Sequence, residues 1–409
     1  MKKIYLLLAL LACVFDLSAQ KQYRIWQNGE STRVTISDSP VITYGSNGST
    51  VTLGGTTYQT ADIDSICPIH QVFVNYSGAT ATVSIPAAVA ADVTANANGA
   101  YVTITNNNVS NEVEFVLSGS STDGAFTYNG AYKATIVLNG LSLTSNQGAA
   151  LDLQCGKRMA LVLGDGTVNT LADYAKGEQK GSLYCKGHLE VEGAGTLNVT
   201  GNLTHAIKVK EYMQLKKSTG TINIVSAVGD AIHMGQYYLQ NGGTVNITST
   251  TKGDGIQVEL LTLDDDVTPD PDEENNGQVM INGGSINIEV ASEDCEAIKC
   301  DSLVTISGGT FNITASGNGS RGIQTDGDMV INENSNATNI TIAATGNLCT
   351  NEDDADDPHR CMGIKVDGNL TITAGTVTVT NTGKKSRGIK VGGTYTVSGT
   401  ANVTANVKN

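Results

Sequence analysis

Acidic residues recur at one position of a repeated phrase, and this pattern could bind a cation. The phrase holds a small residue, an isoleucine, a polar residue and usually an apolar residue, as in Ala231-Ile232-His233-Met234. Two positions before the isoleucine, successive phrases have His205, Asp230, Asp254, Glu296, Arg321, Met362 and Arg387. If the repeats stack, the three consecutive acids lie about 5 Å apart, where like charges repel by roughly 3 kcal/mol at an effective dielectric constant near 20. Because Ca²⁺ binds several carboxylate and carbonyl oxygens, Asp230, Asp254 and Glu296 predict a calcium site.

Other acids could add oxygen ligands, and both acidic columns also have an interpretation without a metal ion. The segment before Met362 contains Asp353 and Asp354, which could lend ligands to this first column. Three positions after the isoleucine, a second column holds Glu259, Asp301, Asp326 and Asp367. In the second column Asp326 and Asp367 precede glycine in ordinary turns, so metal binding is the weaker interpretation there. The alternative for the first column is a row of exposed turn acids, screened by water and by its basic members.

Between these columns, one polar residue per repeat is expected to face outward. Successive phrases place there Lys208, His233, Gln257, Lys299, Gln324, Lys365 and Lys390. This partly basic strip could hydrogen-bond sugar hydroxyls or pair with uronate carboxylates, or it could be a solvated strand face. Tyr212 and Tyr237 share a position in adjacent repeats. They could contact sugars, or they could be half-buried wall residues with wet hydroxyls.

These columns require a stacked fold, and the spacing of the phrases predicts one. The isoleucines stand 24 or 25 residues apart in four steps, and 41 or 42 residues apart in the two steps that contain insertions. Each period also carries a phrase of the form Gly-Thr-x-Asn-Ile, whose polar and apolar residues alternate as in a half-buried strand. Two or three short strands per period leave no room for a helix. The sequence therefore predicts an all-β, right-handed parallel β-helix (a solenoid) of about nine coils.

The second phrase is expected to place Thr and Asn on the outer surface. The pairs are Thr221 and Asn223, Thr244 and Asn246, Ser285 and Asn287, and Thr310 and Asn312. A flat face of hydroxyls and amides could lie along an extended polymer. Stacked Thr and Asn also stabilise solenoids, and this is the favoured interpretation.

Four segments differ in composition and predict the domain organisation. Residues 1–19 have the features of an export signal, with Lys2 and Lys3 before an apolar run and a small-residue site ending at Ala19. An alternative is a lipoprotein anchor at Cys13. Residues 20–69 predict a small N-terminal β module, 70–115 a β cap or leading strands, and 116–409 the parallel β-helix. The protein is therefore expected in the periplasm, outside the cell or at its surface.

The charge balance limits the partners that the chain could bind. The formal net charge is −15 and the pI is about 4.7, which disfavours nucleic acid and anionic membranes and permits divalent cations. No later segment is apolar enough to insert into a membrane, and a monomer is expected. Cys155 and Cys185 lie one coil apart in the repeat and could be bonded. Cys349 and Cys361 bracket the insertion at residues 350–360 and could also be bonded, although pairing does not follow from sequence.

Four phrases are similar to those of a known family, at residues 137–141, 181–187, Gly253-Asp254-Gly255-Ile256 and 281–284. Through these phrases, residues from about 110 to 395 resemble the bacterial carbohydrate-binding β-helix proteins. The resemblance implies a right-handed parallel β-helix, bound calcium, and binding to plant cell-wall polysaccharides such as cellulose or polygalacturonate, in a fold similar to that of calcium-dependent pectate lyases. The aspartate of the family phrase maps onto Asp230 and Asp254. Arg321, Met362 and Arg387 depart from it, so the later coils are expected to lack that site.

Three functions follow from these features as hypotheses. The favoured one is a non-catalytic carbohydrate-binding protein stabilised by Ca²⁺, with sugar contacts from Lys208, His233, Gln257, Lys299, Tyr212 and Tyr237. The alternative is a calcium-dependent polysaccharide lyase of the pectate type, in which Lys299 or Lys365 removes a proton beside a uronate carboxylate. A structural surface protein or adhesin is the third.

Overall fold

The computed structural model of the chain describes residues 21–27, 30–36, 43–45, 48–178, 180–248, 250–263, 267–350 and 358–408. The chain divides into two compact units, residues 1–71 with 112–114, and residues 72–111 with 115–409. The expected export signal and the acids Asp353 and Asp354 lie outside the described residues. Within the described part, no helix has the length and apolar character needed to cross a membrane.

The first unit is a small antiparallel β module. Its strands are β1 (Lys21–Gln27), β2 (Glu30–Ile36), β3 (Thr43–Tyr44), β4 (Thr50–Leu53), β5 (Thr56–Gln59) and the start of β6 (Ser65–Ser77). Strand β1 pairs with β2 and with β6, and β4 pairs with β3 and β5. Ile25, Val34, Val51 and Leu53 form its buried core.

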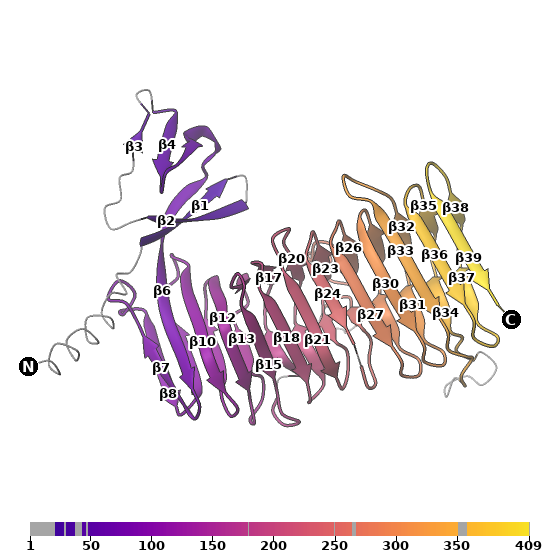
Figure 1. The fold of residues 1–409 in the computed structure, drawn as a ribbon, viewed down its shortest axis with the longest axis horizontal. Coiled ribbons are helices and arrows are strands. Elements are labelled where there is room, and N and C mark those ends of the chain that lie inside the picture. Colours follow the sequence, from indigo (N-terminus) through magenta and orange to yellow (C-terminus); the bar gives the residue numbers. More distant parts are fainter. Residues whose placement is uncertain are drawn as a thin grey trace, which may run out of the picture. The chain divides into compact units, whose positions relative to one another are not determined.

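The second unit is a parallel β-solenoid in which each turn adds one strand to each of three series (Figure 1). It begins with β7 (Thr80–Ser84), β8 (Val93–Asn98) and β10 (Val113–Ser121). The first series is β9 (Tyr101–Asn106), β11 (Ala125–Gly130), β13 (Leu151–Gln154), β16 (Gly181–Cys185), β19 (His205–Val209), β22 (Ile232–Met234), β25 (Ile256–Val258), β28 (Glu296–Cys300), β31 (Arg321–Thr325), β34 (Met362–Val366) and β37 (Arg387–Val391).

The other two series share β12 (Ala134–Thr144) and then separate. The second series is β14 (Met159–Leu163), β17 (Leu189–Glu192), β20 (Met213–Leu215), β23 (Tyr237–Gln240), β26 (Gln278–Ile281), β29 (Leu303–Ile306), β32 (Asp328–Ile331), β35 (Leu370–Ile372) and β38 (Tyr395–Val397). The third series is β15 (Val168–Ala172), β18 (Thr196–Gly201), β21 (Thr221–Ala227), β24 (Thr244–Ile247), β27 (Ser285–Val290), β30 (Gly309–Ala315), β33 (Thr338–Ala344), β36 (Thr376–Asn381) and β39 (Asn402–Val407).

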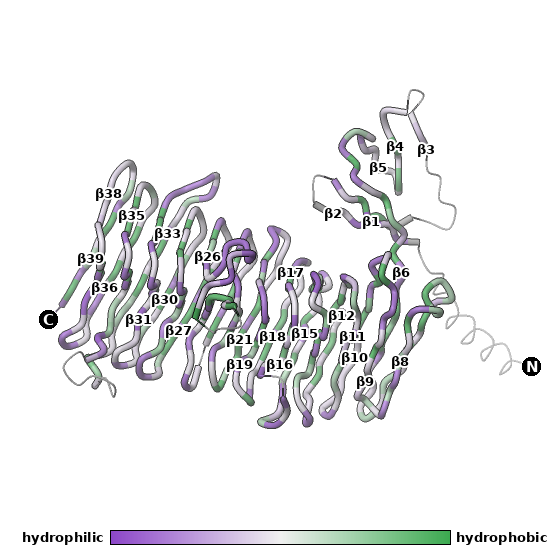
Figure 2. Tube along the Cα trace, turned by 180° about the vertical axis from the view of Figure 1, so that it is seen from behind, coloured by the Kyte–Doolittle hydropathy of each residue, from purple (hydrophilic) through white to green (hydrophobic). Residues whose placement is uncertain are grey.

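The isoleucines of the repeated phrase form a buried column, as predicted. Ile207 pairs with Ile232, and Ile232 with Ile256, and all three are fully buried. The solenoid has about 12 turns rather than nine, because Val102 and Phe126 continue the same column through turns that lack the phrase. Figure 2 shows hydrophobic and hydrophilic residues alternating along these turns. Side chains therefore alternate between an aliphatic interior and the surface.

A backbone step explains why a small residue precedes each isoleucine. The N–H groups of Ala231 and Ile232 both donate to the next turn, to the carbonyls of Asp254 and Gly255 at 2.8 and 2.9 Å. In a regular parallel strand, consecutive N–H groups point to opposite neighbours. At this step, two successive side chains therefore point inward. The first of them lies against the third series and must be small. In a later phrase, for example, a Cβ on Gly322 would lie 2.6 Å from Ile342 Cγ2.

The cysteines of the described residues are free. The suggested pair of Cys155 and Cys185 is wrong, because Cys185 aligns with Leu153 in the strand register. Cys349 and Cys361 are also unbonded, and both are buried packing residues.

A methyl group at the step is expected to be costly where the third series lies close. In Gly363→Ala the new Cβ would lie 2.2 Å from Val379 Cγ1, so we expect the free energy of unfolding to fall by about 1–3 kcal/mol. Gly388→Ala is the matched control, since its nearest atoms are 3.4 Å away. Denaturant unfolding of both variants checks this, and equal stability of the two would contradict the inward step.

Candidate functional site

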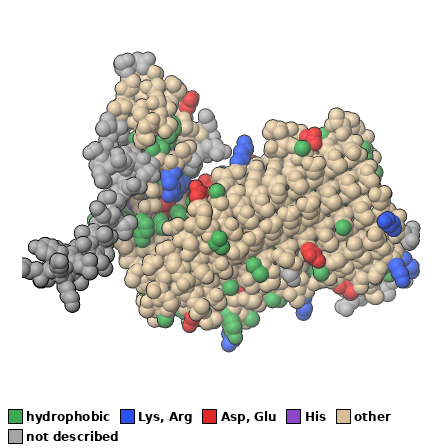
Figure 3. Space-filling view, viewed as in Figure 1, with side chains coloured by type: hydrophobic (Ala, Val, Ile, Leu, Met, Phe, Trp, Pro, Cys, Tyr) green, Lys and Arg blue, Asp and Glu red, His purple; other side chains and the backbone are tan. Residues whose placement is uncertain are grey.

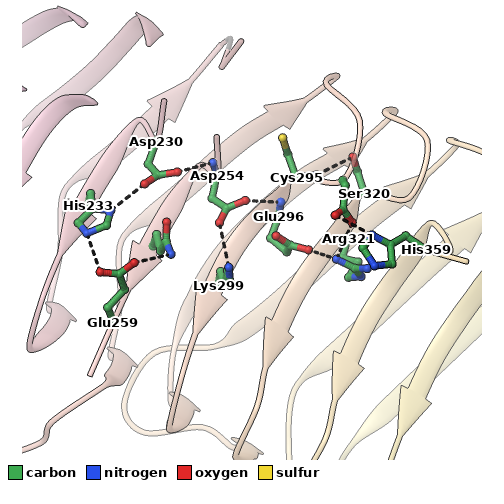
Figure 4. Close-up of polar contacts among 12 residues, drawn as sticks. Asp230, His233, Asp254, Glu259, Cys295, Glu296, Lys299, Ser320, Arg321 and His359 are labelled. Atoms are coloured by element: carbon green, nitrogen blue, oxygen red, sulfur yellow. Dashed lines mark hydrogen bonds and ion pairs between the residues drawn. The ribbon is translucent and has the colours of Figure 1, made fainter. Parts of the chain in front are cut away.

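The three predicted acids stack in one buried column on the outer side of the first series (Figure 4). Asp230 Oδ1 accepts the backbone N–H of Asp254 at 2.8 Å, and Asp254 Oδ1 accepts the N–H of Glu296 at 2.7 Å. Their exposed fractions are 7%, 6% and 3%, so the alternative of exposed turn acids is wrong. Each acid before Glu296 thus satisfies a backbone donor of the next turn, which a buried amide requires.

Basic side chains of the protein lie beside each acid of the column. His233 Nδ1 lies 2.7 Å from Asp230, Lys299 Nζ lies 3.9 Å from Asp254, and Arg321 bonds to Glu296. Burial and the neighbouring charge of Glu296 raise the pKa of Asp254 well above its usual range. The repulsion that predicted a bound cation is therefore offset by these side chains and by protonation.

The column does not fit the calcium ion that the sequence predicted. Ca²⁺ takes six to eight oxygen ligands in a flexible shell. Here Glu296 is paired with Arg321, and Asp254 has one oxygen on a backbone N–H and the other near Lys299. Too few free oxygens remain on the described residues of the column to make that shell.

A different group in the same column could hold a metal ion. His205, Asp230 and His233 bring one ligand atom each within 4.8 Å of the others. Asp230 Oδ2 lies 3.3 Å from His205 Nδ1 and 2.7 Å from His233 Nδ1, and the two rings are 4.6 Å apart. In the repeat, His205 belongs to the acidic column and His233 to the polar strip, so the sequence pattern assigned them separate roles. The missed signal was that the residue two before the isoleucine and the residue directly after it face the same side.

Burial and hydrogen bonds shift the pKa values in this group. Burial lowers the pKa of His205 to about 4. Burial also lowers the pKa of His233, but hydrogen bonds to Asp230 and Glu259 outweigh it and raise the pKa overall. Burial favours protonated Asp230, yet the bonds from His233 and the Asp254 N–H, with the two histidines, lower its pKa.

The second acidic column serves turns and side-chain pairs. Glu259 accepts from His233 at 3.1 Å and from Gln257 at 3.0 Å. Asp301 accepts the backbone N–H of Leu260 at 3.0 Å, and Asp367 accepts from Lys365 at 3.0 Å. Asp326 precedes a turn glycine, as the turn interpretation expects. These contacts favour the turn interpretation over a metal site in the second column.

The polar strip between the columns is largely engaged within the protein. His233 is only 5% exposed and has a carboxylate on each ring nitrogen. Lys299 lies beside Asp254, Gln257 donates to Glu259, and burial lowers the pKa of Lys208. Few groups of the strip therefore remain for a sugar.

One member of the predicted tyrosine pair, Tyr212, has both ring faces occupied. Tyr212 stacks on Tyr237 with ring centroids 4.5 Å apart and planes 10° apart, and on its other face it stacks on His188 at 4.3 Å. The Tyr212 hydroxyl donates to Glu190 at 3.1 Å. Sugar rings stack on aromatic faces, so Tyr212 cannot offer one.

The outer surface of the third series is flat, regular and almost uncharged. We call the Thr/Asn face the outward residues Thr196, Asn198, Thr200, Thr221, Asn223, Thr244, Asn246, Ser285, Asn287, Glu289, Thr310, Asn312, Thr314, Asn339, Thr341, Thr376, Thr378 and Thr380. Figure 3 shows a broad face of the solenoid on which charged side chains are few. Within the face, five asparagines form a ladder of four hydrogen bonds, in which each Nδ2 after the first residue donates to the preceding Oδ1 at 2.8–2.9 Å. The ladder supports the predicted stabilising role and leaves part of each amide exposed.

Comparisons with known proteins agree with this fold. A family model described as "Carbohydrate-binding domain-containing protein" matches residues 98–405. The solved structure of the polysaccharide lyase-like protein from C. thermocellum, a gadolinium derivative, is similar, with a TM-score of 0.53 and 20% identity over 65% of this chain and 97% of that chain. At this identity the likeness concerns the fold alone. No curated protein matches the chain.

Removing the cation from a buried pair is expected to destabilise the column. In Arg321→Met the Glu296 carboxylate, which is 3% exposed, would lose its partner, so we expect a loss of about 3–5 kcal/mol in the free energy of unfolding. Arg387→Met is the control, because that residue has the equivalent position and is exposed. Adding Glu296→Gln to Arg321→Met is expected to recover part of the loss in urea unfolding, and no recovery would argue against a charge effect.

Asp152 lies two strands before Lys208 in the same outward position, and burial raises its pKa from 3.8 to about 6. The folded state thus binds the carboxyl proton of Asp152 more tightly than the unfolded chain does. The stability that this protonation contributes is complete below about pH 4 and is lost as pH rises through about 6. Asp152→Asn is expected to remove this dependence and to be more stable at pH 7 by up to roughly 3 kcal/mol. Thermal melts from pH 4 to 7 measure it, and parallel curves for both proteins would refute the assignment.

Proposed function

We propose that this chain, which belongs to the family of carbohydrate-binding domain-containing proteins, binds a neutral polysaccharide along its Thr/Asn face without cleaving it. The observation that carries the proposal is the long, uncharged array of hydroxyls and amides on the third series. We also propose that the protein meets this polymer outside the cytoplasm, because residues 1–19 have the composition of an export signal.

The geometry of the Thr/Asn face suits an extended polymer. Parallel strands repeat about every 4.8 Å, so equivalent groups recur at constant spacing along the solenoid. An amide has two donors and two acceptor lone pairs, and the ladder uses one of each, so every asparagine within it keeps capacity for a ligand. The threonine hydroxyls of the face add donors and acceptors beside the ladder. A polymer with regularly repeated hydroxyls could contact several turns at once.

The charge of the surface favours a neutral polymer over a polyuronate. Glu289 is the one charged residue among those that define the face. With a net charge of −15, the chain repels polyanions at long range. A cellulose-like glucan therefore fits better than polygalacturonate. Binding of this kind has no requirement for Ca²⁺.

The lyase alternative is disfavoured by the state of its candidate bases. A general base must be unprotonated near the working pH. Burial lowers the pKa of Lys299, but the charges of Asp254, Glu296 and other acids outweigh it and raise the pKa above its ordinary value. Lys365 lies 3.0 Å from Asp367, in an ion pair. Neither lysine is placed to take a proton readily, which favours binding without catalysis.

Two arginines on the Thr/Asn face are expected to block the polymer. Asn312 and Thr341 are exposed on adjacent turns, so Asn312→Arg with Thr341→Arg would project two long charged side chains from the contact surface. We expect affinity for a neutral β-glucan to fall at least about 10-fold, equivalent to roughly 1.4 kcal/mol. Depletion of protein from solution by the insoluble glucan, with a chelator present, measures this.

The matched control places the same charges on the second series. Thr305→Arg with Thr371→Arg changes outward threonines of β29 and β35 and is expected to keep full retention. Equal loss in both double variants, or in neither, would reject the Thr/Asn face. Retention on polygalacturonate alone would reject a neutral ligand, and release of unsaturated product with Ca²⁺ present would establish a lyase.

A further inference from the structure

We propose that His205, Asp230 and His233 form a binding site for Zn²⁺ that joins two successive turns of the solenoid. His205 belongs to β19, and Asp230 and His233 belong to the next turn, around the start of β22. The three residues are 8%, 7% and 5% exposed. A metal ion here would link the turns where their charged column begins.

The ligand types favour zinc over calcium. Imidazole nitrogen and carboxylate oxygen are ordinary zinc ligands, whereas Ca²⁺ is held by oxygen alone. Zn²⁺ binds these atoms at about 2.0–2.2 Å, so tetrahedral ligands lie about 3.3 Å apart. The observed distances from Asp230 Oδ2, 3.3 Å to His205 Nδ1 and 2.7 Å to His233 Nδ1, require only a small expansion to reach this geometry.

Glu259 occupies the position of an orienting partner. Its Oε2 lies 3.1 Å from Nε2 of His233, the nitrogen that faces away from Asp230. Metal-binding histidines usually present the second ring N–H to a carboxylate, which fixes the tautomer and makes the ligand more basic. His233 already has this arrangement. In the metal-bound state Nδ1 would bind the ion and Nε2–H would donate to Glu259.

The local charge also suits a divalent cation. Asp230 and Glu259 supply two negative charges, and both histidines would be neutral as ligands. Lys208 is the cation that acts on both histidines, and its charge opposes metal binding. The Glu259 side chain is 47% exposed, so the site has an edge open to solvent. Three protein ligands would leave a fourth position for water.

Two contacts must change when the ion binds. The hydrogen bond between His233 Nδ1 and Asp230 Oδ2, 2.7 Å long, is replaced by bonds from both atoms to the ion. His205 Nδ1 accepts the backbone N–H of Asp230 at 3.2 Å, and the same lone pair would have to turn toward the metal. This bond is long for an N–H donor, but its loss leaves the buried N–H of Asp230 without this acceptor, a cost that the bonds to the ion must exceed.

The test uses the purified full chain after treatment with a chelator. Titration with Zn²⁺ in a calorimeter is expected to show one equivalent bound, and the melting temperature is expected to rise with Zn²⁺ but not with Ca²⁺, because a ligand that binds only the folded state stabilises it. Co²⁺, used as a spectroscopic substitute, is expected to give the strong visible absorption of a four-coordinate site.

Substitutions assign the ligands. His205→Gln and His233→Gln are each expected to abolish the one-equivalent binding, and Glu259→Gln to weaken it by about 10–100-fold. His188→Gln is the control, since this histidine precedes β17 of the second series and pairs with Glu211 rather than with the group. Thermal melting in the presence of a chelator shows which variants fold. If a histidine variant fails to fold, Glu259→Gln and the Co²⁺ spectrum of the wild-type chain still decide the test.

The proposal has clear contrary outcomes. It is overturned if the wild-type chain binds no Zn²⁺, if His205→Gln binds as well as wild type, or if Ca²⁺ competes at similar concentration. None of these outcomes bears on the Thr/Asn face, so polysaccharide binding is judged separately.

Discussion

The backbone step before each isoleucine is the constraint on which the outer surface of the first series depends. Two successive N–H groups donate to the same neighbouring turn, so two successive side chains enter the core. The first is a small residue, Ala, Gly or, at position 182, Ser, because the third series lies within contact distance. The residues on either side of the step then face outward together. Without the step, Asp230 and His233 would lie on opposite faces of the strand, because side chains alternate.

That arrangement produces a buried column whose charges change sign along the solenoid. Imidazole groups at His205 and His233 flank Asp230, the carboxyls of Asp254 and Glu296 follow, and Arg321 comes after them. At Met362 the same position becomes apolar. Buried charges are tolerated only when each is paired or hydrogen-bonded. Neighbouring turns supply those partners, so each charged residue depends on the identity of the residues above and below it.

The repeat predicted the fold and the columns, but it could not predict the partners within them. Ile232 and Ile256 recur at a fixed spacing, and parallel stacking follows from that spacing alone. The pairing of Asp230 with His233 depends instead on the backbone step. Strict alternation of side chains would place these two residues on opposite faces, so the repeated phrase alone does not reveal their contact. The early turns were missed for a related reason, since Val102 and Phe126 fill the isoleucine column without its neighbours. The acids were therefore assigned to calcium although nearby lysine, arginine and histidine side chains already balance them.

The two phrases of each repeat serve different purposes, and the more distinctive one does not form the proposed binding surface. The phrase with Asp before Gly-Ile, as at Asp254, has its polar atoms committed to neighbouring turns. Its strict pattern therefore reports how the solenoid is built. The Gly-Thr-x-Asn-Ile phrase leaves hydroxyls and part of each amide directed outward, as at Asn312. A surface that binds a polymer needs polar groups that are not fully hydrogen-bonded within the protein. The regular third series therefore suits polysaccharide binding better than the charged first series.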